Sequence, residues 1–280
     1  MLTETGKNLA ALGCAVLFAG AAAAQQVELT LTLANNAYVV GEPVLVQLEA
    51  LNTMRDLLDV GGKDSKDALV VEITKGGEYN ELTPFSDGPI GGTFQLKPGQ
   101  KYQQKVELDK WFPVIEEGKY IVRFVLVHEG MRFESIKKSF DVVPGIPVKD
   151  GVQMFVKRQN QKRLFKLVFW HRNQTDRLFL RIEDDPSGKV WDSLDLGTLL
   201  RSSEPKLDIS PEGEVTVLHR ATQDAYIRTV LWSLPDAVEV VERNNLIDPE
   251  ISASQRVKSL YGEMVDDGGD KKKKSWWKFW

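Results

Sequence analysis

Residues 27–33 read Val-Glu-Leu-Thr-Leu-Thr-Leu, with apolar and polar side chains in strict alternation. Successive side chains of a β-strand point to opposite faces, so a period of two predicts a strand with one buried and one solvated face. A second alternating run occupies residues 44–50, after a turn that contains Gly41 and Pro43. This region therefore predicts two strands of a sheet.

Short runs of the same kind recur up to residue 143. Turn residues separate them, for example at Lys75-Gly76-Gly77, Lys97-Pro98-Gly99 and Glu117-Gly118. Seven or so short strands in roughly 115 residues is the spacing of a β-sandwich. We therefore expect a mainly β chain whose first domain, residues 25–145, is an antiparallel sandwich.

Three stretches of this domain carry a family resemblance. They are Gly41-Glu42-Pro43-Val44 with Asn52, Leu96-Lys97-Pro98-Gly99-Gln100, and Glu117-Gly118-Lys119-Tyr120-Ile121-Val122. Together they resemble the Ig-like sandwich domains common in secreted bacterial proteins, over roughly residues 27–143. The resemblance implies a late strand that begins near Tyr120, with this ring near a corner of the sandwich. It implies no function, because such sandwiches host many unrelated roles.

The pattern changes after Val143-Pro144-Gly145-Ile146-Pro147, where two prolines and a glycine predict a linker. Residues 150–262 are again rich in strand-like runs and contain a possible internal sequence repeat, which we call the echo. The stretch from His171 to Arg181 is repeated in outline from His219 to Arg228, with an Asp five positions after each His. The echo predicts two related hairpins, so we expect a second antiparallel β-domain built from two four-strand halves.

The echo also supplies the candidate catalytic residues, His171, His219, Asp176 and Asp224. If the two hairpins stack, the imidazoles and carboxylates come together, and such a group could bind a metal or transfer protons. In the alternative interpretation, each His, Arg and Asp brackets its own turn as a local ionic clasp. The clasp is favoured because no HxH or HExxH spacing occurs. We therefore assign no metal site.

The composition narrows the classes of function. Cys14 is the only cysteine, and it lies within residues 1–24, which are interpreted below as a signal peptide. The chain after residue 24 is therefore expected to have neither a disulfide nor a cysteine nucleophile. The net charge of −4 argues against nucleic-acid binding by the body of the chain. Neither a glycine-rich phosphate-binding loop nor a nucleophile elbow occurs. We therefore assign no cofactor and no nucleic-acid partner, and we favour a binding protein over an enzyme.

Residues 1–24 have the features of a secretory signal peptide. Lys7 supplies a positive charge, an apolar stretch covers residues 9–24, and Ala22-Ala23-Ala24 offers a small-residue cleavage site. This stretch is shorter than the roughly 20 residues that span a bilayer, which argues against a membrane anchor. We expect a periplasmic or extracellular protein.

Residues 263–280 are predicted to be a flexible tail with a distinctive end. Acidic residues and glycines at 266–270 predict a solvated tether. Lysines gain roughly 1 kcal/mol each near an anionic surface, and aromatic rings prefer the bilayer interface. The residues predicted to contact a membrane surface or a partner are Lys271, Lys272, Lys273, Lys274, Trp276, Trp277, Lys278, Phe279 and Trp280.

These features favour a secreted, non-enzymatic binding or assembly protein of the cell envelope. The tail would attach it to a membrane surface or to an envelope protein. The alternative is a carbohydrate-handling accessory protein or a hydrolase that uses His171 and His219. The alternative requires the two histidines to converge in an open cleft. The oligomeric state is left open.

Overall fold

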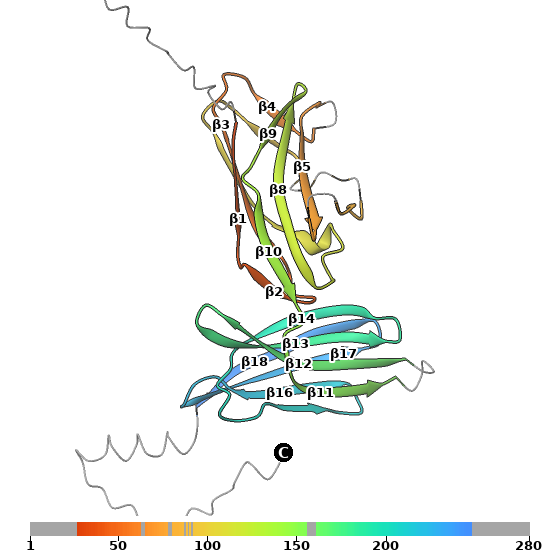
Figure 1. The fold of residues 1–280 in the computed structure, drawn as a ribbon. Helices are drawn as coiled ribbons and strands as arrows, with labels where there is room; N and C mark the ends of the chain where they lie inside the picture. Colours follow the sequence, from red (N-terminus) through yellow and green to blue (C-terminus); the bar gives the residue numbers. More distant parts are fainter. Residues whose placement is uncertain are drawn as a thin grey trace, which may run out of the picture.

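The computed structural model describes residues 27–247, except 63–64, 78–79, 87, 89, 91 and 156–160. The predicted signal peptide (1–24) and the predicted tail (263–280) lie outside the described residues. The described part contains 18 strands and one 3-10 helix, η1 (Leu108–Lys110), and no α-helix (Figure 1). The prediction of a mainly β chain with antiparallel sheets is confirmed.

The N-terminal unit, residues 27–143, has two main sheets and a small one. The first sheet has the order β1 (Val27–Leu33), β3 (Leu45–Asn52), β7 (Lys101–Glu107). The second has the order β2 (Ala37–Val39), β10 (Lys138–Val143), β8 (Gly118–His128), β5 (Ala68–Lys75), with β9 (Met131–Glu134) also paired to β8. The small sheet pairs β4 (Leu58–Val60) with β6 (Phe94–Leu96). All pairings in these sheets are antiparallel except that of β2 with β10.

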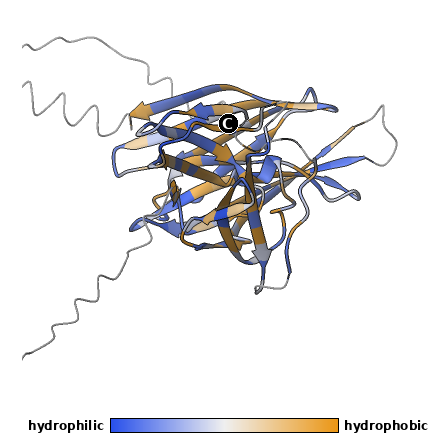
Figure 2. Cartoon of the chain, turned by 90° about the horizontal axis from the view of Figure 1, so that it is seen from above, coloured by the Kyte–Doolittle hydropathy of each residue, from blue (hydrophilic) through white to orange (hydrophobic). Residues whose placement is uncertain are grey.

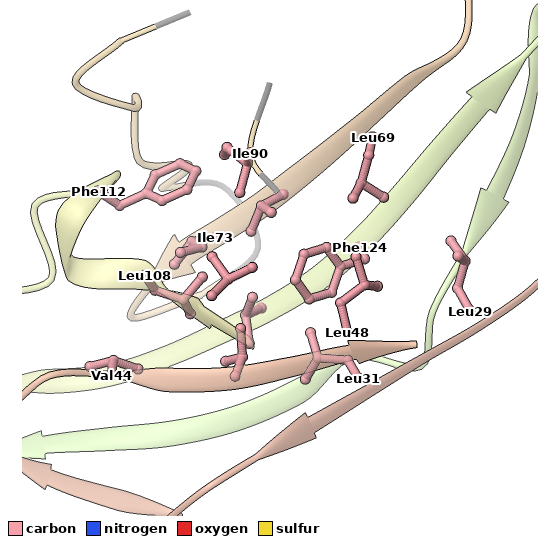
Figure 3. Packing of buried hydrophobic residues seen from close by; sticks show 14 of the residues in the cluster. Leu29, Leu31, Val44, Leu48, Leu69, Ile73, Ile90, Leu108, Phe112 and Phe124 are labelled. Carbon is pink, nitrogen blue, oxygen red and sulfur yellow. The ribbon is translucent and has the colours of Figure 1, made fainter. Parts of the chain in front are cut away.

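Alternation along the strands builds the core of this unit. In β1 the apolar residues Val27, Leu29 and Leu31 are buried, while the polar residues between them are exposed. Figure 2 shows the same alternation of hydrophobic and hydrophilic residues along other strands. Leu48 and Phe124 come from different sheets and belong to one buried cluster between them (Figure 3). Burial of this cluster holds the two sheets together.

The C-terminal unit, residues 146–247, contains two four-stranded antiparallel sheets with the same connectivity. One has the order β11 (Ile146–Met154), β12 (Lys162–Arg172), β13 (Thr175–Asp185), β14 (Lys189–Thr198). The other has the order β15 (Lys206–Ile209), β16 (Glu214–Arg220), β17 (Ala225–Leu234), β18 (Ala237–Ile247). Buried residues from both sheets form one cluster between them. The two echoed hairpins are the central strand pairs of these two sheets.

The two hairpin turns differ, which corrects the predicted equivalence of their Asp residues. The β12–β13 loop is Asn173-Gln174, and both residues have positive φ, 49° and 65°. This short loop places Asp176 directly opposite His171 in the register. In the second hairpin a longer loop, residues 221–224, places Ile227 opposite His219. The spacing of His and Asp is therefore repeated in the sequence without the same pairing.

The connection between the units is shorter than the predicted linker. Strand β10 ends at Val143 and β11 begins at Ile146, so only residues 144–145 lie between strands. Gly145 has φ 73°, and a Cβ at this position would lie 2.8 Å from Cγ2 of Val168. A larger residue would therefore clash with the sheet of the C-terminal unit. The short connection leaves little freedom between the units.

The outer face of the β11–β14 sheet packs against the N-terminal unit. Val39 of the N-terminal unit forms a small buried cluster with Val168 and Phe179, and Val143 and Trp170 pack against it. Figure 1 shows β2 and the end of β10 meeting this sheet. The other face of the same sheet covers the core of the C-terminal unit. The β11–β14 sheet is therefore covered on both sides.

Candidate functional site

His171 lies at the end of β12 in a local clasp. Its Nδ1 is 2.9 Å from Oδ1 of Asp176, and Nε of Arg201 is 2.7 Å from Oδ2 of the same carboxylate. The His171 side chain is 68% exposed. His171 and Asp176 thus bond across their own turn, but the arginine paired with this carboxylate is Arg201 and not Arg172 of the predicted clasp.

His219 is in a different environment. It is 1% exposed, and neither ring nitrogen has a hydrogen-bond partner among the described residues. Burial lowers the pKa of His219 to about 4; the charge of Arg243 lowers it further, while Thr198 and Asp195 act in the opposite direction. Asp224 lies in the exposed loop, where its backbone N–H donates to Thr222 Oγ1. His219 and Asp224 therefore do not form a second clasp.

The four candidate residues thus divide into one bound pair and two separate residues. The structure brings His171 and Asp176 together, and no contact between described residues joins them to His219 or Asp224. Within the described ranges, no group of three or more His, Cys, Asp or Glu could hold a metal ion. The arrangement offers one exposed imidazole that is oriented by a carboxylate.

A stronger polar contact joins the two units at their junction. Nη1 and Nη2 of Arg172 each donate to one carboxylate oxygen of Glu42, both at 2.7 Å. Nη2 also donates to the carbonyl oxygen of Ala37 at 2.8 Å, and Glu42 Oε2 accepts from the N–H of Val39 at 2.9 Å. We call Arg172 and Glu42 the junction clasp. Two parallel bonds of this kind fix direction as well as distance.

The junction clasp is buried and enclosed by aromatic rings. The Arg172 guanidinium lies 5.3 Å from the ring centroid of Phe179 and 5.9 Å from that of Tyr38. Burial alone would lower the pKa of Arg172, but Glu42 outweighs it and the pKa is raised. Burial raises the pKa of the Tyr38 phenol. Because the clasp is desolvated and doubly bonded, removing either partner alone would leave an unpaired charge at the junction.

A glycine allows the Glu42 turn to approach the second unit. Gly41 has φ 82°, and a Cβ there would lie 2.5 Å from Cγ1 of Val190. The left-handed conformation and the close contact both require glycine. Glu42 is thereby brought within bonding distance of Arg172.

A cleft of about 300 Å³ lies beside the junction clasp. The N-terminal unit contributes the β1–β2 loop, the β2–β3 turn and residues of β2 and β3, and the C-terminal unit contributes β14. Its lining is mixed, with apolar and polar side chains from both units. The lining residues are Ala34, Asn35, Tyr38, Glu42, Pro43, Leu45, Asp192, Ser193, Leu194 and Asp195. We call this space the junction cleft.

The polar side chains of the junction cleft differ in how fully they are bonded. Asp195 accepts from Arg177 Nε at 2.8 Å and from the N–H of Gly197 at 2.8 Å. Asp192 accepts from the N–H of Ser193 at 2.7 Å, and no Lys or Arg of the described part of the chain pairs with it. Burial raises the pKa of Asp192, and the charge of Asp109 adds to this shift. The cleft therefore contains one carboxylate without a cationic partner.

Sequence reasoning missed the junction clasp. Glu42 stood in a stretch quoted for its resemblance and Arg172 in the echo, but the two residues are 130 positions apart. The available signals were a turn Glu after a glycine and an Arg in a strand next to an Asn-containing loop. Neither signal identifies its partner, because pairing across units depends on how the outer faces of the sheets meet.

The described part of the chain has no helix long and apolar enough to cross a membrane. No protein-family model matches the chain, and no curated protein matches it. Among solved structures, the chain is similar to the crystal structure of Spo0M, a sporulation control protein from Bacillus subtilis. That match has 10% sequence identity and a TM-score of 0.27, and it covers 85% of this chain and 97% of that one. A similarity at this level transfers neither a family nor a function.

Proposed function

We propose that the protein is a secreted, non-enzymatic binding or assembly protein of the cell envelope. Residues 271–280 would attach it to a membrane surface or to an envelope protein. Residues 1–24 would direct it to the periplasm or the outside of the cell, and the N-terminal unit would be an Ig-like sandwich. The proposal assigns the two β-units to a structural role and the attachment to the tail.

The junction clasp is the observation that carries the proposal. It ties Glu42 of one unit to Arg172 of the other, next to a connection of only two residues. A body of this kind presents its surfaces at a defined angle, which suits a protein that holds a partner or bridges two others. The aromatic and basic residues of 271–280 supply an attachment that such a body needs.

The hydrolase alternative has weaker support. It requires His171 and His219 to act together, but His219 is buried without a hydrogen-bond partner among the described residues. The remaining support is the exposed pair of His171 and Asp176. Within the described part of the chain, no serine or threonine is bonded to this imidazole as a nucleophile would be.

Co-sedimentation with vesicles tests the membrane version of the proposal. The full chain without residues 1–24 and the same chain without 271–280 are mixed with vesicles of anionic lipid and with vesicles of neutral lipid. We expect the longer form to sediment with anionic vesicles, less so at high salt, and the shorter form to stay in solution. Equal sedimentation of the two forms would refute the membrane version.

A matched pair of variants separates the two parts of the tail. One variant replaces the four lysines 271–274 with serine, and the other replaces Trp276, Trp277 and Trp280 with serine. Both are expected to weaken binding, and only the tryptophan variant keeps the salt dependence. Attachment to an envelope protein instead predicts capture from envelope extract by the longer form only, with no vesicle binding.

A further inference from the structure

We propose that the N-terminal unit binds an extended segment of a partner protein in the opening between β1 and β10, and that a carboxylate of this segment pairs with Lys138. The segment would become the next strand of the sheet, beside β1. This inference goes beyond the proposed function, because it requires neither residues 271–280 nor a membrane. It gives the protein a second binding surface and its partner a chemical character.

The opening lies at the edges of the two main sheets of the N-terminal unit. Strand β1 is the last strand of its sheet, and in the other sheet β2 pairs only with residues 141–143 of β10. Residues 138–140 of β10 are therefore paired on one side only among the described strands. An open groove of about 490 Å³ lies here, and residues 31–33 and 137–139 line it. Figure 1 shows β1 beside β10, with β2 at one end. We call this space the lateral groove.

The free edge of β1 offers backbone groups to the lateral groove. The N–H of Ala34 donates to the carbonyl oxygen of Leu45 at 3.1 Å. Alternate residues of an antiparallel strand bond to the same neighbour, so Thr32 also bonds to β3. The N–H and C=O groups of Leu31 and Leu33 therefore point away from β3, and no backbone group of another described residue bonds to them. An unpaired edge of this kind is a template for a further strand.

Strand β10 faces the same groove from the other sheet. The N–H of Asp141 donates to the carbonyl oxygen of Asn36 at 2.9 Å, on the side of β10 where β2 lies. By the same alternation, the N–H and C=O of Ser139 point to this side, at a position that β2 does not reach. A strand that enters the groove would pair directly with β1, which is how sheet edges bind extended peptides.

The side chain of Lys138 gives the lateral groove a positive charge. Lys138 lies on the same face of β10 as Phe140, because successive side chains of a strand alternate, and Phe140 belongs to the core between the sheets. Lys138 is nevertheless exposed, because it lies beside the opening. Lys137 lies on the opposite face, so Lys138 is the cation that a strand between the sheets would meet. No Asp or Glu is among the described residues that line the groove, so its charge favours a partner with a carboxylate.

An inward-directed lysine also excludes other strands. Lysines and inward-pointing charges at a sheet edge oppose the addition of apolar strands, because pairing would bury the ammonium without a counter-ion. A carboxylate on the incoming strand removes this cost, so the same residue rejects neutral strands and accepts an acidic one. A second copy of β1 does not fit, because its inward side chains Val27, Leu29 and Leu31 are apolar. The occupant that fits is an acidic segment of another protein.

Selection from a random peptide library supplies a probe and tests the inference. Peptides of about ten residues, long enough to cover β1, are displayed on phage and selected on the full chain without residues 1–24. Excess free peptide of residues 271–280 is added to remove phage that bind the tail. We expect the enriched peptides to include a group in which β-branched residues alternate around an Asp or Glu. The absence of such a group would overturn the proposal.

Amide hydrogen exchange shows whether a synthetic peptide from this group is added as a strand. The amides of Leu31 and Leu33 should exchange at least tenfold more slowly in the complex, because they gain hydrogen-bond partners. The amides of Thr30 and Thr32 already bond to β3 and should change much less. Equal protection of all four amides, or of none, would contradict the addition of a strand to β1.

Charge reversal locates the site. Lys138→Glu should weaken binding of the synthetic peptide at least fivefold, because an attractive cross-strand pair becomes a repulsive one. Replacement of the peptide carboxylate by lysine should restore binding to Lys138→Glu but not to the unchanged chain, an exchange that a merely structural role of Lys138 would not produce. Lys162→Glu is the matched control, because Lys162 is an exposed lysine on β12 of the C-terminal unit. Equal binding by the two variants would refute the lateral groove as the site.

A further measurement separates this inference from the proposed function. Removal of 271–280 should leave binding of the synthetic peptide unchanged, and Lys138→Glu should affect vesicle binding no more than Lys162→Glu does. If the peptide binds the lateral groove but no vesicle binding occurs, the inference stands and the membrane version fails. If vesicle binding depends on 271–280 but Lys138→Glu does not weaken peptide binding, the proposed function stands and the inference fails.

Discussion

Arg163 and Arg172 are both buried, both pair with a carboxylate and both lie near aromatic rings, but they join different parts of the molecule. Arg163 bonds to Asp184 within the C-terminal unit, with Nε 2.8 Å from Oδ1. Arg172 bonds to Glu42 across the junction. The same type of arginine–carboxylate pair therefore joins two parts of one unit in the first case and two different units in the second.

The two arginines also differ in how completely they are bonded. Arg163 is 0% exposed, and its guanidinium donates to Asp184, to Ser233 Oγ and to carbonyl oxygens of the β17–β18 turn. Arg172 has a buried Nε without a partner among the described residues. An arginine that is fully bonded within one unit, like Arg163, is expected to affect mainly the stability of that unit. A partly bonded charge at a junction is better placed to set the angle between units.

The largest effect is expected from Arg163→Leu. Its removal leaves the buried Asp184 carboxylate with only Trp191 and Gln161 as side-chain donors, which should lower the free energy of unfolding by about 3–5 kcal/mol. Urea unfolding followed by far-UV circular dichroism measures this change. The double variant Arg163→Leu with Asp184→Leu should recover part of the loss. A single variant as stable as the original would contradict the role given to Arg163.

His219 is buried like the two arginines but has no bonded carboxylate, so its contribution to stability should depend on pH. The pKa of His219 is about 4 in the folded protein and near 6.5 when unfolded, so the unfolded chain binds more protons between these values. Stability should therefore fall as the pH drops from 6.5 to 4, by roughly 3 kcal/mol from this residue. Urea midpoints at pH 7 and pH 4.5 measure the fall. His219→Leu should reduce it, and an unchanged fall in that variant would exclude His219 as its source.

A smaller loss of stability but a larger change of shape is expected from Arg172→Leu. Glu42 keeps its bond from Val39 N–H, and water can enter the opened junction, so the loss should be about 1–3 kcal/mol. Small-angle X-ray scattering should show a wider range of angles between the units, while the amide spectra of both cores stay unchanged. Arg163→Leu, measured at low temperature where it is folded, is the matched control and should leave the angle as it was.

The smallest effect is expected from His171→Ala. The imidazole is mostly exposed, and Asp176 keeps its ion pair with Arg201 at 2.7 Å. Exposed pairs contribute little, so the free energy of unfolding should change by less than about 0.5 kcal/mol. A loss above 2 kcal/mol in urea unfolding would show that the His171–Asp176 pair contributes as much to stability as a buried ion pair.

The local pattern predicted the strands well because alternation depends on neighbouring residues. The runs at 27–33 and 44–50 correspond to β1 and to most of β3, and the predicted halves of the second domain are two sheets of four strands. Strand β4 has only three residues, which is too short for alternation to identify it. The sequence therefore predicted the mainly β structure, but it did not predict short strands in irregular regions.

The polar sites were much less predictable. His171 and Asp176 were found because a short hairpin places residues five positions apart opposite each other. His219 looked identical in sequence, but the longer loop changed its cross-strand partner, and burial on the core side removed it from solvent. The pairing of Glu42 with Arg172 depends on the packing of two sheets, and the sequence around either residue has no information about that.

The double coverage of the β11–β14 sheet limits how the chain can be divided. Its outer surface includes Val168 and Phe179, which are buried only because the N-terminal unit lies over them. Produced alone, residues 146–247 would expose this apolar surface together with the unpaired Arg172, and would tend to associate with other copies. The second unit therefore depends on the first to cover its apolar outer face, and the two need to be produced as one chain.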